Sequence, residues 1–218
     1  MHRRLILGAL ALVSVLGAGY YFTRSEPLAP FAVNAQTSGT VDKSRVLEMA
    51  IGAAEAPVTV IEYASFTCPH CASFHAGQYQ ELKRDYIDTG KVRFVIREVY
   101  FDRFGLWAGM VARCGGPERY FGIVDLLFER QRQWLGDGDP VKIAQNLRII
   151  GKTAGLSEPQ LDACLSDSAM AEAMVAVFEE NRDRDQVEGT PSFMIDGQKY
   201  SNMSYAEFSR ILDERLGR

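Results

Sequence analysis

The sequence predicts an α/β domain in which a single sheet is interrupted by an inserted helical block. Two runs of β-branched and apolar residues, 58–64 and 91–99, flank a segment with helical periodicity, which gives a strand-helix-strand unit. Residues 101–187 then contain no convincing strand, and strand signals return at 192–195. Because strands stand on both sides of the helical segment, we expect one sheet domain with an insertion at about 102–188, not two serial domains.

Length, composition and charge limit the class of protein. The chain has 218 residues, of which 47% are hydrophobic and 24% are charged, so it can bury a full core within one domain. Its formal net charge is −4, and it has no basic stripe of the kind that neutralises phosphates. We therefore expect no nucleic-acid partner.

The N-terminal segment has the layout of an export signal. Two arginines near the start precede the uncharged run 5–22, as in the n-region and h-region of a signal peptide. The same run is just long enough to span a bilayer, and Tyr20 and Tyr21 stand where an interfacial belt would lie. Residues 1–22 are thus predicted to be a signal peptide or a membrane anchor, and residues 23–43 a linker or leader. Either reading takes the protein out of the cytoplasm.

The first half of the sheet domain follows in order along the chain. Residues 46–51 favour an edge strand, and residues 58–64, which are apolar almost throughout, favour a strand buried on both faces. After Pro69, apolar or small residues recur at helical spacing until Thr89-Gly90 ends the pattern, so one helix is expected between the two strands. A right-handed crossover through this helix would make strands 58–64 and 91–99 parallel.

The sheet resumes after the helical block. Asp196-Gly197 is a strong hairpin turn between a strand at 192–195 and a partner strand around 199–200. A capping-box pattern then opens a last helix at 204–216. The helices expected within the block are 106–114, 117–134, 141–153, 158–165 and 169–186.

The four cysteines fall into two pairs of different kinds. An even number of cysteines in an exported chain suits two pairs, because disulfides form and persist in oxidising compartments. Cys68 and Cys71 are three residues apart, at the junction between the buried strand and the first helix. Cys114 and Cys164 are distant in sequence, and both fall in expected helices of the inserted block. The two pairs therefore need separate explanations.

The segment Cys-Pro-His-Cys predicts a reactive dithiol. A cysteine at a helix N-terminus faces unpaired N–H groups, which favours a thiolate on Cys68. Pro69 suits the first helical turn because it needs no hydrogen-bond donor there, and His70 can add positive charge or a hydrogen bond near the sulfur. Cys71 lies a turn into the helix and is expected to be the buried resolving partner. A stabilised thiolate makes the disulfide a stronger oxidant and Cys68 a good leaving group.

Two other readings of this segment remain open, a structural disulfide and part of a metal site. A closed zinc site needs four ligands, whereas the chain has three histidines, one of them in the signal segment, and no second CxxC. Cys68, His70 and Cys71 together would hold copper only weakly. We therefore expect no metal and no cofactor, and we keep an extracytoplasmic metal-binding protein as the alternative of a different class.

Three segments of the chain together resemble the DsbA family of disulfide oxidoreductases. They are the strand and dithiol at 58–71, with the sequence VTVIEYASFTCPHC, the helical insertion, and the segment GTPSF at 189–193. The resemblance extends from about residue 46 to the C-terminus. It implies a thioredoxin-like fold, a periplasmic location, the oxidation of reduced or unfolded exported proteins, and reoxidation by a DsbB-type membrane partner linked to quinones.

The resemblance also assigns roles to Glu62, Thr190 and Pro191. The family places a buried acid at the position of Glu62, six residues before Cys68, where it relays protons for the dithiol; an outward-facing strand residue is the alternative. Thr190-Pro191 matches the cis-proline loop that lies beside the dithiol, and a cis bond is cheap only before proline. The backbone edge at Thr190 can pair with an extended substrate chain. A trans proline that starts an edge strand is the alternative.

Thr190 also introduces the nearest rival function. Threonine before the cis-proline resembles isomerases of the superfamily more than the best-known oxidase. An isomerase or reductase kept reduced by a membrane electron donor is therefore the alternative to an oxidase. Such isomerases dimerise through an added N-terminal domain, for which residues 23–43 leave too little room, so we expect a monomer.

The second cysteine pair is interpreted through the same resemblance. The segment 154–165, which contains Cys164, is similar to part of some DsbA-like proteins. We expect a structural disulfide between Cys114 and Cys164, with two unpaired buried thiols as the alternative. A catalytic role is not expected, because neither cysteine belongs to a CxxC motif.

Overall fold

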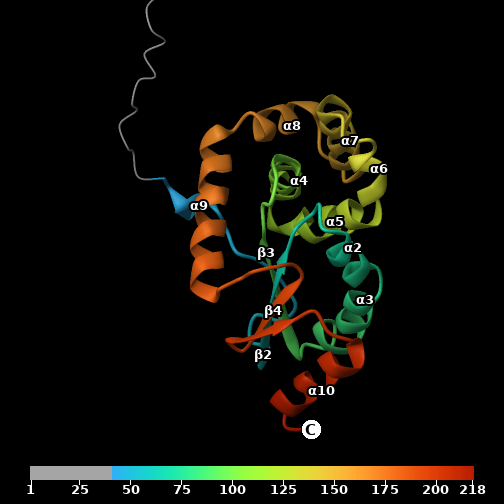
Figure 1. Ribbon diagram of the computed structural model, residues 1–218, viewed down its shortest axis with the longest axis vertical. Helices are drawn as coiled ribbons and strands as arrows, with labels where there is room; N and C mark the ends of the chain where they lie inside the picture. The colour runs from blue at the N-terminus through green and yellow to red at the C-terminus, as the bar shows by residue number, and fades with distance from the viewer. Residues whose placement is uncertain (1–40) are drawn as a thin grey trace, which may run out of the picture. The chain divides into compact units, whose positions relative to one another are not determined.

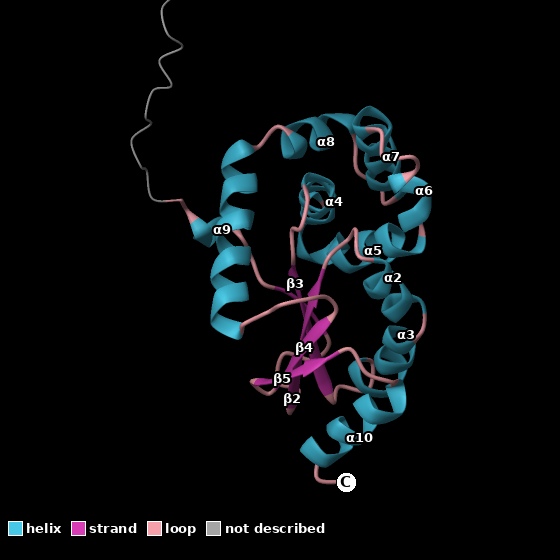
Figure 2. Ribbon diagram, viewed as in Figure 1, coloured by secondary structure: helices cyan, strands magenta, loops and turns pink. Residues whose placement is uncertain are grey.

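A computed structural model of the chain describes residues 41–218. The predicted signal peptide or membrane anchor at 1–22, and most of the predicted linker at 23–43, lie outside the described residues. Within the described part, no helix is long and apolar enough to cross a membrane. The strands there form one five-stranded sheet in the order β1-β3-β2-β4-β5 (Figure 2), so the predicted α/β class is confirmed.

The elements follow the order expected from the sequence. The strands are β1 (Met49–Ile51), β2 (Val58–Ala64), β3 (Val92–Glu98), β4 (Ser192–Ile195) and β5 (Gln198–Ser201). The helical elements of the sheet domain are η1 (Lys43–Arg45), α2 (Pro69–Ala76), α3 (Gln78–Leu82), the π-helical turn η2 (Lys83–Ile87) and α10 (Tyr205–Arg215). The inserted helices are α4 (Arg103–Cys114), α5 (Gly116–Glu129), α6 (Gln131–Leu135), α7 (Pro140–Thr153), α8 (Glu158–Leu165) and α9 (Ser168–Asp185). Figure 1 shows α2 and α3 on one side of the sheet and α9 on the other, with α4 to α8 beyond one end of it.

Strand β2 is the centre of the sheet and has its predicted bounds. It pairs in parallel with β3, as the strand-helix-strand pattern predicted, and antiparallel with β4. Five of its seven residues are buried, because neighbouring strands occupy both of its edges and helices cover both faces of the sheet. The chain that leaves β2 at Ala64 is therefore held in a fixed place, and this end of the strand leads directly to the cysteine pair.

The prediction of one continuous helix between the two parallel strands was wrong. Helix α2 ends at Ala76, Gly77 takes backbone angles of φ −126° and ψ −85°, and α3 begins at Gln78. Glycine lacks a Cβ atom, so it leaves helical geometry at little cost and weakens a helix interior. Phe74 and Tyr79, one on each side of the break, pack into the same core. The apolar periodicity therefore continues through the break and does not reveal it.

A second predicted helix, at 117–134, is also divided. Helix α5 ends at Glu129, Arg130 takes φ −103° and ψ 18°, and α6 begins at Gln131. No glycine or proline marks this position in the sequence. The turn brings the buried side chain of Gln131 against the loop that carries the dithiol, so a tertiary contact accompanies the break.

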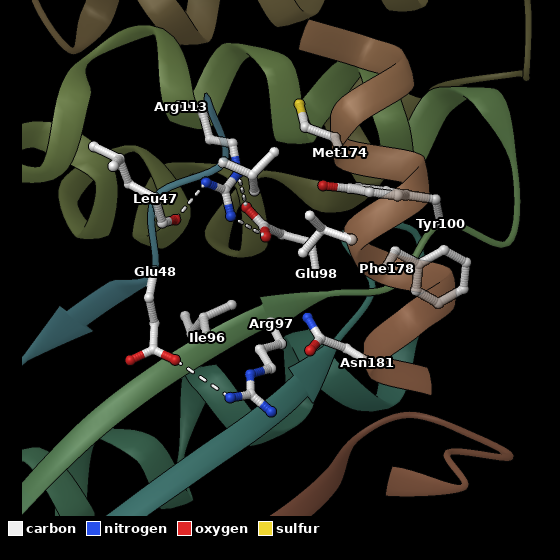
Figure 3. Close-up of a pocket in the computed structure, with 12 residues that line it drawn as sticks. Leu47, Glu48, Ile96, Arg97, Glu98, Tyr100, Arg113, Met174, Phe178 and Asn181 are labelled. Atoms are coloured by element: carbon white, nitrogen blue, oxygen red, sulfur yellow. Dashed lines mark hydrogen bonds and ion pairs between the residues drawn. The ribbon is translucent and has the colours of Figure 1, made fainter. Parts of the chain in front are cut away.

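A buried ion pair joins β3 to helix α4. The Glu98 carboxylate accepts hydrogen bonds of 2.8 and 2.6 Å from the Arg113 guanidinium (Figure 3). It accepts a third, of 2.8 Å, from the Tyr120 hydroxyl. Arg113 also donates to the carbonyl of Leu47 at 2.8 Å. Burial alone would lower the pKa of Arg113, but the charge of Glu98 raises it above its usual value. The pair fixes the inserted block to the sheet, because α4 packs in turn on α5, α7, α8 and α9.

We predict that Arg113→Met lowers the free energy of unfolding by about 3–5 kcal/mol, because it leaves the Glu98 carboxylate buried without its cation. Urea unfolding of the purified protein measures this change. Arg210→Met is the matched control, since it breaks the solvent-exposed pair of Arg210 with Glu214 and should change stability little. A loss in Arg113→Met no larger than in the control would contradict the structural importance of the buried pair.

Candidate active site

The dithiol stands where the loop after β2 turns into helix α2. Cys68 is the N-cap residue of α2 and is partly exposed, whereas Cys71, in the first turn, is fully buried at 0% exposure. Both cysteines are free thiols. Pro69 occupies the first helical position, where no backbone donor is required. The local sequence thus presents one sulfur to solvent and encloses the other.

The two sulfurs differ sharply in how readily they ionise. The Cys71 thiol donates a hydrogen bond to the Cys68 sulfur, and this bond is the largest cause of a Cys68 pKa lowered to about 5. Burial opposes the shift, while the backbone N–H groups of Cys71 and His70 add to it. The same sulfur-sulfur bond raises the pKa of Cys71, and burial and the charge of Glu62 raise it further. One thiolate at Cys68 is therefore the stable charge state of the pair near neutral pH.

His70 acts on the thiolate through its backbone. The N–H of His70 is one of the groups that lower the pKa of Cys68. Its imidazole is exposed at the surface, and no hydrogen bond from the ring to either sulfur is present. The sequence predicted that His70 adds positive charge or a hydrogen bond near the sulfur, and in the structure the hydrogen bond comes from its backbone N–H at the start of the helix.

The predicted cis-proline loop lies against the exposed sulfur. The Thr190-Pro191 peptide bond is cis, and the Cys68 sulfur lies 3.3 Å from the Thr190 carbonyl oxygen, close enough for a hydrogen bond when Cys68 is a thiol. The Thr190 hydroxyl is buried and has no hydrogen-bond partner among the described residues. The loop precedes β4, which pairs with β2, so the sheet itself brings residues 190–191 to the dithiol.

The predicted acid, Glu62, is buried beneath the dithiol at 0% exposure and has a partner that the sequence did not indicate. Its Oε2 atom lies 2.8 Å from Nε2 of His75, which is itself 3% exposed. His75 stands one helical turn after Cys71 on α2, so both face the sheet. The spacing of four residues between Cys71 and His75 could have shown that both side chains lie on the same face of the helix. It could not have shown that Glu62 is the partner of His75.

Residues of the inserted block hold the loop that leads to Cys68. Gln131 donates to the backbone carbonyls of Phe66 and Cys68 at 2.8 and 2.9 Å. Asp102 accepts a hydrogen bond of 2.7 Å from the Thr67 hydroxyl and also caps helix α4. Sequence reasoning missed both Gln131 and Asp102, because each reaches the loop only through the tertiary fold.

The other two cysteines are bonded to each other away from any CxxC motif. A disulfide joins Cys114, the last residue of α4, to Cys164 near the end of α8, with their Cα atoms 5.8 Å apart. Neither sulfur has a hydrogen bond to the dithiol loop. Within residues 41–218, no group of three or more histidine, cysteine, aspartate or glutamate side chains is arranged to hold a metal ion.

Comparisons with known proteins identify the family to which this chain belongs. A family model described as Thioredoxin matches residues 44–214. The chain belongs to the thioredoxin family. A Rickettsia bellii protein whose name includes the words protein-disulfide oxidoreductase is 32% identical over 170 residues, which are 78% of this chain and 64% of that protein. Disulfide bond formation protein D of Bacillus subtilis is 23% identical over 178 residues, 76% of each chain. The chain spans only about three fifths of the length of the rickettsial relatives.

Solved structures refine the family to the DsbA type. The crystal structure of Wolbachia pipientis alpha-DsbA1 superposes with a TM-score of 0.73 at 25% identity, over 80% of this chain and 96% of that chain. A protein-disulfide isomerase from Novosphingobium aromaticivorans gives 0.71 at 26% identity, over 78% and 98%. These comparisons confirm the predicted thioredoxin-like fold and the predicted resemblance to DsbA.

We predict that replacing both Cys114 and Cys164 by alanine lowers the free energy of unfolding by about 4 kcal/mol in the chain-entropy account, because the bond closes a loop with a sequence separation of 50. Urea unfolding of the dithiol forms of the variant and the wild type measures the loss. The alkylation rate of Cys68 in the folded variant should match the wild type. A folded variant whose Cys68 had lost its rapid alkylation would show that the second disulfide supports the reactive site and not only stability.

Proposed function

We propose that the protein is an exported thiol-disulfide oxidoreductase that transfers the Cys68–Cys71 disulfide to reduced exported proteins. The observation that carries the proposal is the asymmetry of the two sulfurs. The hydrogen bond from the Cys71 thiol is the largest cause that lowers the pKa of the accessible Cys68 to about 5. The same hydrogen bond raises the pKa of the buried Cys71. An accessible, stabilised thiolate beside a buried thiol is the state that thiol-disulfide exchange requires of a reduced enzyme.

The exchange begins on the oxidised protein. A client thiolate attacks Sγ of Cys68, the bond between Cys68 and Cys71 breaks, and Cys71 leaves with the electron pair and takes up a proton. A second client thiolate then attacks the client sulfur of the mixed disulfide, which forms the client disulfide and releases Cys68 as a thiolate. Because the Cys68 thiolate is stabilised, it is a good leaving group, and the equilibrium favours the reduced enzyme and the oxidised client.

The cis-proline loop supplies the site for the client backbone. The Thr190 carbonyl already lies 3.3 Å from the Cys68 sulfur, so a client cysteine bound to that sulfur brings its own backbone beside the loop. Main-chain hydrogen bonds to residues 190–191 would align an extended chain without reading its side chains. This mode suits an enzyme that acts on many reduced or unfolded proteins.

Location and recycling complete the proposal. The pattern of residues 1–22 supports export to the periplasm by a signal peptide that is either cleaved or retained as an anchor. A DsbB-type membrane partner linked to quinones would return the dithiol to the disulfide, and the enzyme would act as a monomer. The reading as an extracytoplasmic metal-binding protein has no supporting cluster of ligands within residues 41–218.

The second candidate is a disulfide isomerase or reductase that a membrane donor keeps reduced. Thr190 favours it through its resemblance to isomerases, and one of the similar solved structures, from Novosphingobium aromaticivorans, is described as a protein-disulfide isomerase. The two candidates differ in the reduction potential of the Cys68–Cys71 couple. The oxidase proposal requires a couple well on the oxidising side of cytosolic thioredoxin, which lies at about −270 mV.

We predict that Cys68→Ser abolishes the introduction of a disulfide into a reduced model peptide, because no nucleophilic or leaving sulfur remains at the accessible position. Cys71→Ser, treated instead with the disulfide form of the peptide, should accumulate a mixed disulfide between Cys68 and the peptide, since no Cys71 thiol is present to displace it. Mass spectrometry of the peptide and the protein after the reaction measures both outcomes. Continued peptide oxidation by Cys68→Ser would refute the assigned nucleophile, and a wild-type potential near that of thioredoxin, from glutathione equilibration, would favour the isomerase or reductase.

A further inference from the structure

The chain returns from the inserted block to the sheet through a short irregular segment. Helix α9 ends at Asp185 and β4 begins at Ser192, so residues 186–191, which include the cis-proline loop, connect the two elements. Apart from the contact with Cys68, the described part of the chain gives the last four of these residues one hydrogen bond outside the sheet, from the Ser192 hydroxyl to the Gly189 carbonyl at 2.6 Å. The position of the segment therefore depends on what holds its two ends.

One residue of β2, Tyr63, holds both ends of this segment. In the antiparallel pairing of β2 with β4, Tyr63 lies opposite Ser192, the residue that follows the segment. The Tyr63 hydroxyl donates a hydrogen bond to the carboxylate of Asp185, the residue that precedes the segment. Tyr63 also stands five residues before Cys68, on the strand that leads to the dithiol. The placement of the segment relative to the reacting sulfur therefore depends on this residue.

A closed set of hydrogen bonds keeps the Asp185 carboxylate in place. Arg97 of β3 donates to the Tyr63 hydroxyl and to Asp185, at 3.0 Å each. Arg184 donates to the same carboxylate at 2.9 and 3.0 Å. Burial acts to raise the pKa of Asp185, but hydrogen bonds from Arg184 and Tyr63 lower it, so the carboxylate stays ionised. Hydrogen bonds to an ionised group are strong and directional, so they fix the end of α9 in direction as well as in distance.

Apolar packing joins Tyr63 to the segment itself. Tyr63 is 1% exposed and belongs to a small core cluster with Val99, Phe178 and Val187. Val187 is the second residue of the segment 186–191 and is 8% exposed. Hydrophobic contact is not directional, so it keeps this part of the segment near the sheet without defining one path for the chain. The hydrogen bonds of the tyrosine hydroxyl define that path.

The network lies on the face of the sheet away from the other buried site residues. Successive side chains of a strand point to opposite faces, so Tyr63 faces α9 whereas Glu62 faces α2. Within residues 41–218, no hydrogen bond of the network reaches either sulfur of the dithiol. The network can therefore act on the cis-proline loop while the Cys71 thiol and the helix N–H groups continue to stabilise the Cys68 thiolate.

We propose that Tyr63, acting through Asp185, is a positioning residue that holds the cis-proline loop where a client backbone can pair with it while the client cysteine reacts with Cys68. The inference rests on the proposed disulfide exchange and deepens it, since it names what fixes the client site. Without the tyrosine hydroxyl, the end of α9 can take more than one position, the loop follows it, and a client backbone is aligned less often. A small reagent that reacts only with the sulfur does not depend on the loop.

The test compares two exchange reactions of the full-length oxidised protein. One uses a reduced model peptide, which brings a backbone to residues 190–191, and the other uses dithiothreitol, which brings none. Stopped-flow measurement gives a second-order rate constant for the opening of the Cys68–Cys71 disulfide by each reagent, corrected for the thiolate fraction of the reagent. The ratio of the peptide constant to the dithiothreitol constant reports on the client site, because changes in the reactivity of the disulfide itself cancel.

We expect Tyr63→Phe to lower this ratio by about fivefold to tenfold, the effect of losing about one main-chain hydrogen bond to the peptide. The dithiothreitol constant should stay within about twofold of the wild type. A high peptide concentration should restore the maximal rate, because the change lies in peptide binding and not in the chemical step. The variant should fold, since Phe keeps the ring packing and Arg97 and Arg184 still neutralise Asp185.

Tyr86→Phe is the matched control. The Tyr86 hydroxyl donates to the Asp213 carboxylate at 3.0 Å and lies 3.3 Å from the Ser209 carbonyl, both on α10. The substitution thus removes the same kind of bond from a tyrosine that is also buried. Helix α10 lies at the end of the sheet opposite the inserted block (Figure 1), away from the client site. Both rate constants of this control should stay within about twofold of the wild type.

A second set of variants tests the link through Asp185. Asp185→Ala removes the acceptor of the Tyr63 hydroxyl, so it should lower the ratio by a similar factor. Combining it with Tyr63→Phe should lower the ratio little further, because both substitutions break the same contact. Asp185→Asn keeps an acceptor and should recover part of the loss. Full losses that multiply in the double variant would contradict a shared path.

Two further results would overturn the proposal. One is a Tyr63→Phe protein with the same ratio as the wild type and Tyr86→Phe, which would leave the network a role in stability alone. The other is an equal loss with both reagents, which would place the effect on the disulfide and not on the loop. The wild type tests the proposed function separately. A wild-type peptide constant no greater than its dithiothreitol constant would contradict the client site itself, and with it this inference.

Discussion

A single negative charge on the Cys68 sulfur is the constraint on which the rest of the site depends. The Cys71 thiol stabilises it most, and the backbone N–H groups at the start of α2 contribute further. Each of these donors must point at one atom, so the placement of α2 at the end of β2 is fixed by a common requirement. Strand β2 meets it by pairing with β3 on one edge and β4 on the other, which anchors the chain on both sides of the dithiol.

The inserted helices add to the site by restraining the loop before Cys68. Gln131 on α6 and Asp102 at the start of α4 bond to that loop from the helical block, and the buried Glu98–Arg113 pair secures α4 to the sheet. The loop carries the helix N-terminus, so its position sets how well the N–H groups face the sulfur. The block is thus part of the structure that stabilises the thiolate.

Local chemistry allowed the sequence to indicate the dithiol and the core strand. The β-branched run at 58–64 predicts a strand, and the Cys-Pro-His-Cys segment that follows it predicts the start of a helix with Cys68 at its tip. These signals lie within a few residues of one another, so no tertiary contact was needed to find them. The DsbA resemblance added Glu62, Thr190 and the pairing of Cys114 with Cys164, which no local pattern specifies. The predicted leader at 1–22 lies outside the described residues.

Features that depend on packing between distant segments were not predictable from the sequence alone. His75 appeared as one of several residues on an apolar helix face, and its pairing with Glu62 becomes evident only when α2 lies against β2. The helix breaks at Gly77 and Arg130 were hidden because apolar residues keep their spacing through them. Hydrophobic periodicity reports which face is buried, not which buried polar atoms meet.

The most direct test of the central claim is a titration of the thiolate absorbance near 240 nm in the dithiol protein, with Cys68→Ser as the blank. The account predicts that the Cys68 thiol ionises with a midpoint at a pH of about 5, because the hydrogen bond from the Cys71 thiol stabilises the thiolate. A midpoint near about 8.5, as for a free cysteine, would show that the fold does not stabilise this charge and would remove the basis of the mechanism.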